Sequence, residues 1–261
     1  MTGRPRSSRG FTILELMVAM AIFVLICAAM FGLLQLSQQK YSSESQMSGS
    51  FQEARLGVDQ IVRDINISGY PSLGMFSNPI STAAYAASPF AWDPGYSGVP
   101  CNVGSTCSPT PGDFDLIVET DLGNGNGVSW VRYQLVGTTL YRGVVTKTVG
   151  GDPVAATPTS ALTPFVLNVM NNVTGPLQAQ IAAQYPNRFP NWPVPIFQYT
   201  CNTPSGPQPC ASPAAANYNT VKNISDVDIT LLVKTPQVDM QTQSLQLMEL
   251  SGRGHRSNPT Y

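Results

Sequence analysis

Hydrophobic positions divide the chain into a long helical region and a set of shorter, strand-like segments. Residues 11–36 are almost entirely apolar, and Glu15 is the single charged residue among them. Beyond them, apolar residues recur at alternating intervals of four and three; they are Met47, Phe51, Ala54, Val58, Ile61 and Ile65. This spacing is typical of a helix with one apolar face. We therefore predict a single helix of about 55–60 residues, roughly 85 Å long, that ends near Gly69 and Pro71.

The second half of this helix, residues 37–68, is predicted to be amphipathic. Its polar residues are expected to form a solvated face opposite the apolar one; they are Glu44, Glu53, Arg55, Asp59, Arg63 and Asp64. We expect the apolar face to dock on a sheet. A coiled coil would use the same spacing, but the pattern lasts less than three heptads and strand-like sequence follows it.

Segments rich in β-branched and aromatic residues follow the helix and predict an antiparallel sheet. They cover residues 114–120, 128–136, 138–146, 227–235 and 244–250. Glycines in residues 123–127 and at Gly137 favour tight turns, so the first three strands should form a meander. Proline and glycine concentrate in a predicted connecting loop, residues 69–112, and in a predicted long loop, residues 150–213, within a β-sheet head of residues 113–261. The predicted fold class is therefore α+β, a long N-terminal helix packed on an antiparallel β-sheet with long loops.

Residues 11–36 are long enough to cross a membrane. At about 1.5 Å per residue, these roughly 26 residues span about 39 Å, whereas a hydrocarbon core is about 30 Å thick. Residues 1–10 contain three arginines and no acidic residue, which places the N-terminus on the cytoplasmic side. A cleaved secretory signal is one alternative, but its apolar stretch would cover only about 7–15 residues. A plain signal anchor is the other.

Residues 9–18, with the sequence RGFTILELMV, resemble the class III signal of type IV prepilins and pseudopilins. The resemblance implies that residues 1–10 are a leader peptide, which a prepilin peptidase removes by cutting between Gly10 and Phe11. It implies that the same enzyme N-methylates Phe11, and that Glu15 is the assembly carboxylate of the family. Residues 11–36 would then serve both as the transmembrane helix and as the helix through which subunits pack.

The position of Glu15 suggests a partner for its charge. On a helix, Glu15 lies one turn above Phe11 on the same face, about 6 Å along the axis. A carboxylate in a membrane is stabilised by a cation, and cleavage would free an amine at Phe11 of the same chain or of a neighbouring subunit. We hypothesise that cleavage makes the chain competent for assembly in this way. The alternative is that Glu15 only snorkels to the lipid headgroups.

A more diffuse resemblance lies in the strands. Residues 131–135 (VRYQL) and 140–142 (LYR) are similar to the PilW-type minor pilins and the J-type pseudopilins of type II secretion, which place a further strand pair after a long loop, as residues 196–199 and those from Val227 onward do here. The resemblance implies a minor pilin that primes or caps type IV pilus assembly. Its alternatives are a pseudopilin of a type II secretion or DNA-uptake system and a tip adhesin.

The same resemblance implies partners and a location. The partners would be prepilin peptidase, other minor and major pilins, the inner-membrane assembly platform and, before assembly, membrane lipid. The protein would cross the inner membrane once with a periplasmic head, and would later join an extracellular pilus, at its tip.

Four of the five cysteines form two close pairs in polar loops. The pairs Cys101/Cys107 and Cys201/Cys210 predict two short disulfide-closed loops and an oxidising compartment, whereas Cys27 lies in the apolar helix. Zinc is a rival interpretation, but the spacings are C-x5-C and C-x8-C instead of C-x2-C. Free thiols or crossed pairing stay open as well.

Little else in the chain indicates chemistry. Asp121, Asn124 and Asn126 match part of a calcium loop, but the bidentate Glu of such loops is missing, so a plain hairpin is favoured. The one histidine, His255, is expected in a solvated tail, and the common nucleophile, phosphate-binding and zinc-protease motifs are absent. The net charge is -1 and 11% of residues are charged, which gives no support for nucleic-acid binding. We expect no enzymatic activity, no cofactor and no metal other than this calcium candidate.

Overall fold

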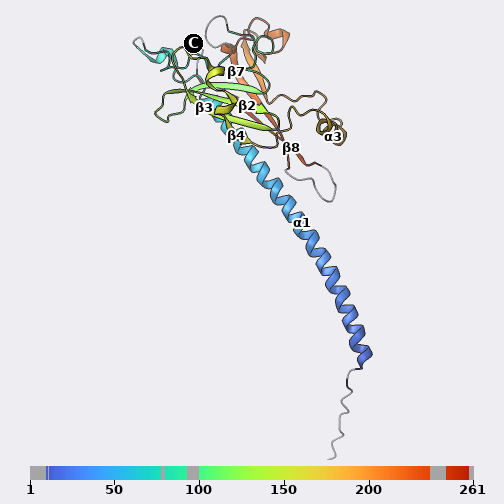
Figure 1. Cartoon of the computed structure of the whole chain (residues 1–261). Coiled ribbons are helices and arrows are strands. Elements are labelled where there is room, and N and C mark those ends of the chain that lie inside the picture. The colour runs from blue at the N-terminus through green and yellow to red at the C-terminus, as the bar shows by residue number, and fades with distance from the viewer. Residues whose placement is uncertain (1–9, 11, 78–79, 93–99, 236–244, 259–261) are drawn as a thin grey trace, which may run out of the picture. The chain divides into compact units, whose positions relative to one another are not determined.

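The computed structural model describes residues 10, 12–77, 80–92, 100–235 and 245–258 (Figure 1). The chain forms two compact units, Met1–Gln46 and Met47–Tyr261. Helix α1 (Ile13–Asn66) begins in the first unit and ends in the second. It stops just before Gly69, whose positive φ of 78° is incompatible with a right-handed helix. The long helix and the antiparallel sheets that follow it confirm the α+β fold class.

An antiparallel sheet of four strands follows the helix in the second unit. Its strands are neighbours in chain order: β1 (Asp115–Asp121), β2 (Val128–Val136), β3 (Thr139–Thr146) and β4 (Thr163–Val166). The predicted meander corresponds to β1, β2 and β3, and β2 has the predicted bounds. Gly125 in the first turn and Gly137 in the second both adopt positive φ, which explains why these turns need glycine.

A second antiparallel sheet contains the remaining strands. Their order across the sheet is β6 (Gly206–Pro209), β5 (Phe197–Thr203), β7 (Ile224–Lys234) and β8 (Leu247–His255). The prediction of one sheet was therefore wrong, because β7 and β8 pair with each other and not with the meander. Sequence patterns identify strands but do not show whether the strands join one sheet or two.

Residues 150–213 contain more regular structure than the long loop predicted there. Besides β4, β5 and β6, they form helices α2 (Pro153–Ala156) and α3 (Pro176–Gln184). The sequence pattern missed β4 and β6 because each has four residues and contains proline. Both are edge strands of their sheets, where a missing N–H is tolerated. Short 3-10 helices occupy Leu73–Met75, Thr159–Ala161, Pro213–Ala215 and Val221–Asn223.

One hydrophobic core joins the C-terminal part of α1 to both sheets. Its buried members include Ala54, Val58, Ile61 and Ile65 from α1, Val131 and Tyr133 from the first sheet, and Phe197, Ile229 and Leu231 from the second. The predicted apolar face of the helix is thus buried from Ala54 onward. Met47 and Phe51 belong to the same pattern but are each 38% exposed. Only about the last four turns of α1 therefore contribute to the core.

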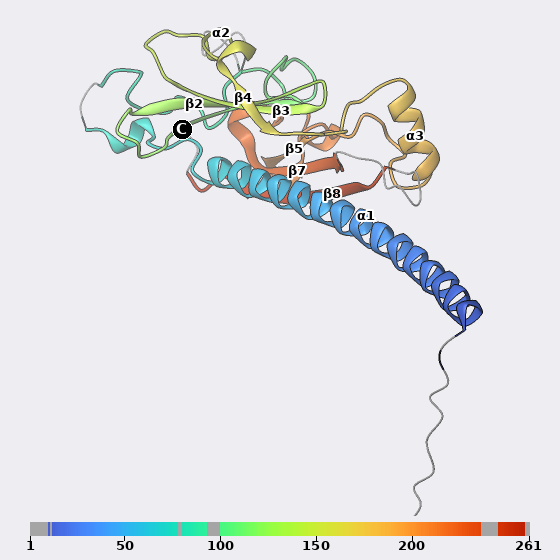
Figure 2. The ribbon, with the colours of Figure 1, turned by 60° about the horizontal axis from the view of Figure 1, so that its bottom comes forward.

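Strand β8 lies against α1 because two glycines leave room for the helix (Figure 2). A Cβ added to Gly254 would lie 2.6 Å from Cγ2 of Ile65, and one added to Gly252 would lie 2.5 Å from Cγ1 of Val58. Both distances are far below van der Waals contact, so only glycine permits this approach. These glycines also explain why the predicted strand stopped at residue 250. Residues 251–255 (SGRGH) lack the β-branched side chains that indicate a strand.

Asp64 contradicts the predicted solvated face of the helix. Its side chain is fully buried, and its Oδ2 accepts hydrogen bonds from the hydroxyl of Tyr133 at 2.5 Å and from Nη2 of Arg142 at 2.8 Å. The prediction failed because a carboxylate beside Arg63 resembles a surface residue until its distant partners are known. The ion pair fastens the end of α1 to β2 and β3.

Candidate functional site

The N-terminal end of α1 holds Glu15 in a capping box. The backbone N–H and the hydroxyl of Thr12 each donate to Oε2 of Glu15 at 3.0 Å. The N–H of Glu15 in turn donates to Oγ1 of Thr12 at 3.3 Å. Thr12 directly precedes Ile13, the first helical residue, so this T-x-x-E pattern satisfies donors that a helix start otherwise leaves unpaired. The pattern is visible in the sequence as Thr12 followed three residues later by Glu15, although it was not among the predicted features.

The two residues of the predicted cleavage site directly precede this cap. Gly10 is exposed, and a Cβ added to it would meet no other atom within 4 Å. Phe11 lies outside the described residues, as do residues 1–9 of the predicted leader. The cut between Gly10 and Phe11 and the methylation of Phe11 therefore stay predictions.

A continuous apolar surface follows the cap in the first unit. The large apolar side chains of α1 are exposed there; Ile13, Leu25 and Leu33, for example, are 82%, 70% and 69% exposed. An 18-residue window of the helix has a mean hydropathy of 2.7, and the helix is long and apolar enough to cross a membrane. Lipid or other apolar helices would remove such side chains from water.

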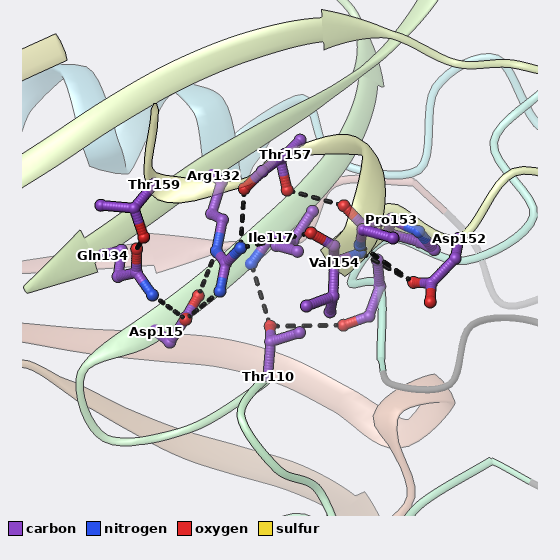
Figure 3. Close-up of polar contacts among 12 residues, drawn as sticks. Thr110, Asp115, Ile117, Arg132, Gln134, Asp152, Pro153, Val154, Thr157 and Thr159 are labelled. Carbon is purple, nitrogen blue, oxygen red and sulfur yellow. Dashed lines mark hydrogen bonds and ion pairs between the residues drawn. The ribbon is translucent and has the colours of Figure 1, made fainter. Parts of the chain in front are cut away.

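The strand residues of the second resemblance form buried polar contacts in the first sheet. Arg132 of β2 donates to Asp115 of β1 through Nε at 3.0 Å and Nη2 at 2.5 Å, and Gln134 donates to the same carboxylate at 3.1 Å (Figure 3). Nη1 of Arg132 donates to the carbonyl of Thr157 at 2.7 Å. Burial raises the pKa of Asp115, although the hydrogen bonds and charge of Arg132 oppose that rise. Arg132 thus holds the segment after α2 on one face of the sheet.

Tyr133 and Arg142 act on the opposite face. Neighbouring residues of a strand point to opposite faces, so Tyr133 lies on the side of α1, where it contacts Asp64. Nε of Arg142 also donates to the hydroxyl of Tyr133 at 3.0 Å. Burial, together with the charge of Asp64, raises the pKa of Tyr133 well above its ordinary value. The residues within 131–142 that carry the resemblance therefore connect the first sheet to α1 and to the segment after α2.

A further buried ion pair anchors the loop before β1. The side chains of Lys147 and Glu119 are 4% and 0% exposed and bind each other. Nζ of Lys147 also donates to the carbonyl of Tyr85 at 2.9 Å, and Oε1 of Glu119 accepts from the N–H of Ala87 at 2.8 Å. Burial raises the pKa of Glu119, and the charge of Lys147 opposes the rise. This pair was not predicted, because nothing local in the sequence marks either residue as buried.

Both predicted disulfides are present, as Cys101–Cys107 and Cys201–Cys210. These four sulfurs are therefore not zinc ligands. The first closed loop lies beside the residue that follows the second, since a Cβ added to Gly104 would lie 3.2 Å from Cβ of Ala211. Each bridge restricts its own loop.

A pocket of about 760 Å³ opens between the two disulfide loops. Val103, Phe197 and Tyr199 line it and are buried, and the hydroxyl of Tyr199 donates to the carbonyl of Gly112 at 2.7 Å. Asp113 lines it as well and is exposed. Partial burial raises the pKa of the Asp113 carboxyl. No local sequence pattern marks this pocket, because its walls come from residues 103–113 and 195–211, which only the fold brings together.

Asp121, Asn124 and Asn126 form local hydrogen bonds in the turn between β1 and β2. Oδ1 of Asp121 accepts from the N–H of Gly123 at 2.8 Å, and Oδ1 of Asn124 accepts from the N–H of Asn126 at 3.0 Å. These are the contacts of Asx turns. Within the part of the chain that the structure describes, no group of three or more His, Cys, Asp or Glu could hold a metal ion. The preference for a plain hairpin over a calcium loop at this turn stays a prediction.

His255 belongs to β8 and not to a polar tail. Its Nδ1 lies 3.0 Å from Oδ1 of Asp226, and its backbone N–H donates to Oδ1 of Asn66 at 2.8 Å. The imidazole is 68% exposed. The expectation of a solvated side chain holds in part, but the expectation of a tail was wrong because the strand continues through Gly254.

Residues 5–31 match a family model described as the prokaryotic N-terminal methylation motif. The matched residues include the predicted cleavage site, the capping box and part of the apolar helix. Searches of curated proteins and of solved structures found no match. The matched motif is consistent with a type IV pilin-like protein. A long apolar helix followed by antiparallel sheets also fits the type IV pilin fold.

Proposed function

We propose that this chain is a minor pilin, a structural subunit that primes or caps type IV pilus assembly. The observation that carries the proposal is the methylation motif of residues 5–31, placed at the start of a long apolar helix that continues into an α+β head. Prepilin peptidase cuts between Gly10 and Phe11 and methylates Phe11. The apolar part of α1 first anchors the subunit in the inner membrane, with the head in the periplasm, and then packs with the helices of other pilins.

The carboxylate of Glu15 is the proposed assembly contact. It is the only charged residue within residues 11–36, and its Oε2 already accepts two hydrogen bonds from Thr12. A carboxylate in an apolar bundle gains most from a cation nearby. The amine that cleavage frees at Phe11, in the same or a neighbouring subunit, supplies that cation.

The size of the head supports the proposed priming or capping position. Everything after residue 66 lies outside α1, including two sheets and two disulfide loops. A head of this size would crowd the repeating lattice of a filament shaft, whereas a complex at the tip needs to place only one copy. The similarity of residues 131–142 to PilW-type minor pilins supports the same choice. The inner-membrane assembly platform and the major pilin are the expected partners.

A pseudopilin of a type II secretion or DNA-uptake system is the second candidate. The methylation motif favours it equally, because the same signal precedes pseudopilins. Deletion of the gene separates the two functions. Loss of surface filaments with intact protein secretion supports the pilus, whereas loss of secretion with intact filaments supports the pseudopilin. Loss of adherence with filaments and secretion intact would instead support a tip adhesin.

The test of processing and assembly compares two carboxylate variants of α1. Mass spectrometry of the mature protein should find N-methylphenylalanine at position 11 in the unmodified chain and in both variants. Glu15→Ala should then be largely absent from sheared filaments, whereas Glu44→Ala, which removes an exposed carboxylate farther along α1, should enter them normally. A Glu15→Ala subunit that is cleaved and enters filaments at the normal level contradicts the proposed contact.

A further inference from the structure

We propose that the pocket between the two disulfide loops binds ligands that present an ammonium or guanidinium group on an apolar stem. This inference concerns the head alone and goes beyond the proposed role in assembly. It rests on the shape of the pocket, on the residues that line it and on one carboxylate that the fold leaves without a partner.

The walls of the pocket are held in place before any ligand arrives. Residues Cys107 and Cys210 line it, and each is tied into a short closed loop by its disulfide. The N–H of Val103 donates to the carbonyl of Asn219 at 2.7 Å, and the N–H of Cys210 donates to the carbonyl of Tyr199 at 2.8 Å. A pocket with fixed walls loses little conformational entropy when a ligand binds. Its volume of about 760 Å³ is in the range of sites for small organic ligands.

Asp113 is the only charged residue that lines this pocket. Elsewhere among the described residues of the head, six acidic side chains bind an Arg or a Lys, namely Asp64, Asp115, Glu119, Asp226, Asp228 and Glu249. Glu53, Asp121 and Asp152 instead accept hydrogen bonds from backbone N–H groups. Among the described residues, the Asp113 carboxylate has neither an ion pair nor a side-chain hydrogen bond. Its backbone carbonyl, by contrast, is fixed by the N–H groups of Ile196 and Phe197 at 2.9 and 3.1 Å. The fold thus fixes the backbone of Asp113 and leaves its exposed carboxylate without an ion pair.

The remaining lining groups define the rest of the ligand. Val103, Phe197 and Tyr199 are at most 8% exposed, so they offer apolar edges but no open ring face of the kind that stacks on a sugar. Ser105, Ser108 and Gln198 add neutral hydrogen-bonding groups. An anion would meet a carboxylate and no cation. An apolar stem that ends in a positive charge matches both the walls and Asp113, and a lysine or arginine side chain of a peptide or a free alkylamine has this chemistry.

The test measures binding to the full chain in non-ionic detergent micelles by saturation-transfer NMR and titration. The probes are the blocked tripeptide Ala-Lys-Ala, its Ala-Glu-Ala and Ala-norleucine-Ala counterparts, and n-butylamine. We expect the lysine peptide to bind and the glutamate and norleucine peptides to bind about two- to fivefold more weakly, as the loss of one exposed ion pair implies. Equal binding of n-butylamine would support a small amine as the ligand, and weaker binding of n-butylamine would support a peptide side chain.

Matched variants locate the binding. Asp113→Asn keeps the shape of the side chain and should weaken binding of the lysine peptide about two- to fivefold. Asp59→Asn removes the same charge from an exposed position on α1 and should leave binding unchanged. Ser108→Trp, at an exposed lining position, should block the pocket without removing its charge. The proposal is overturned if the lysine peptide does not bind at about 10 mM. It is also overturned if the glutamate peptide binds as tightly as the lysine peptide, or if Asp113→Asn binds the lysine peptide as tightly as the unmodified chain does.

Discussion

Gly254→Ala should destabilise the head by forcing β8 away from α1. The new Cβ would lie 2.6 Å from Cγ2 and 2.7 Å from Cβ of Ile65, and Ile65 is fully buried, so its side chain cannot turn into solvent. Overpacking of this kind costs about 1–3 kcal/mol. Alanine also restricts the unfolded chain, which offsets about 0.4–1 kcal/mol. The free energy of unfolding should therefore fall by about 1–2 kcal/mol.

Thermal unfolding of the full chain in detergent micelles, followed by near-ultraviolet circular dichroism, measures this loss. For a head of this size, it corresponds to a drop in Tm of about 3–6 °C. Gly74→Ala is the control, because a Cβ at Gly74 would meet no atom within 4 Å and its φ is not positive. The control should keep its Tm or raise it slightly. A drop for Gly254→Ala that is no larger than the change in the control would refute the claim of close packing.

A double-mutant cycle separates the clash from other effects of the substitution. Ile65→Ala removes Cγ2 and Cδ1, two of the three atoms nearest to the new Cβ. It destabilises by itself, because it empties part of the core. If the clash is the cause, Gly254→Ala should cost less in the Ile65→Ala background than in the unmodified chain. Additive losses would mean that Gly254→Ala acts through a different mechanism.

Three further outcomes are expected. Asp64→Ala should lower the free energy of unfolding, measured with denaturant, by about 3 kcal/mol, because it leaves the partly buried Arg142 unpaired. The control Asp59→Ala should change it by no more than about 0.5 kcal/mol. Equal effects of the two variants would contradict the buried ion pair. Serine at both Cys201 and Cys210 should cost about 2–3 kcal/mol, since the bridge closes a short loop; an unchanged unfolding midpoint would argue against this bridge. As the pH rises from about 3 to about 7, the free energy of unfolding of Asp113→Asn should increase relative to that of the unmodified chain. Burial raises the pKa of Asp113. The contribution of this carboxyl to stability is therefore complete below its unfolded pKa of about 4 and is lost as the pH rises through its folded pKa. A difference in Tm between the variant and the unmodified chain that does not vary with pH would contradict the raised pKa.

The elements that were predictable from the sequence are those with a local signal. The period of α1 and the β-branched runs of β1, β2 and β3 follow from backbone and side-chain preferences that act within a few residues. The disulfide pairs are close in sequence, so their partners were also evident. β4 and β6 were missed because proline hides a short edge strand, and the end of β8 was missed because its glycines serve contact with the helix.

The parts of the candidate sites that could not be predicted depend on partners far apart in the chain. Asp64 has the sequence context of a surface residue, and only the fold brings it to Tyr133 and Arg142. The pocket follows the same logic, since the strand that positions Phe197 lies far along the chain from Asp113. By contrast, Glu15 was found at once, because a carboxylate within an apolar run is conspicuous without any structure.

The hydrogen bonds between Thr12 and Glu15 bear on how an assembly contact could be prepared in advance. Thr12 follows the predicted cut, so removal of residues 1–10 leaves both partners in the chain. The side-chain torsions of Glu15 are restricted while it accepts from Thr12, and this ordering costs rotamer entropy. That loss occurs when the helix forms and not when subunits meet. One carboxylate would thus link the folding of a helix end to the speed with which a neighbouring amine is captured.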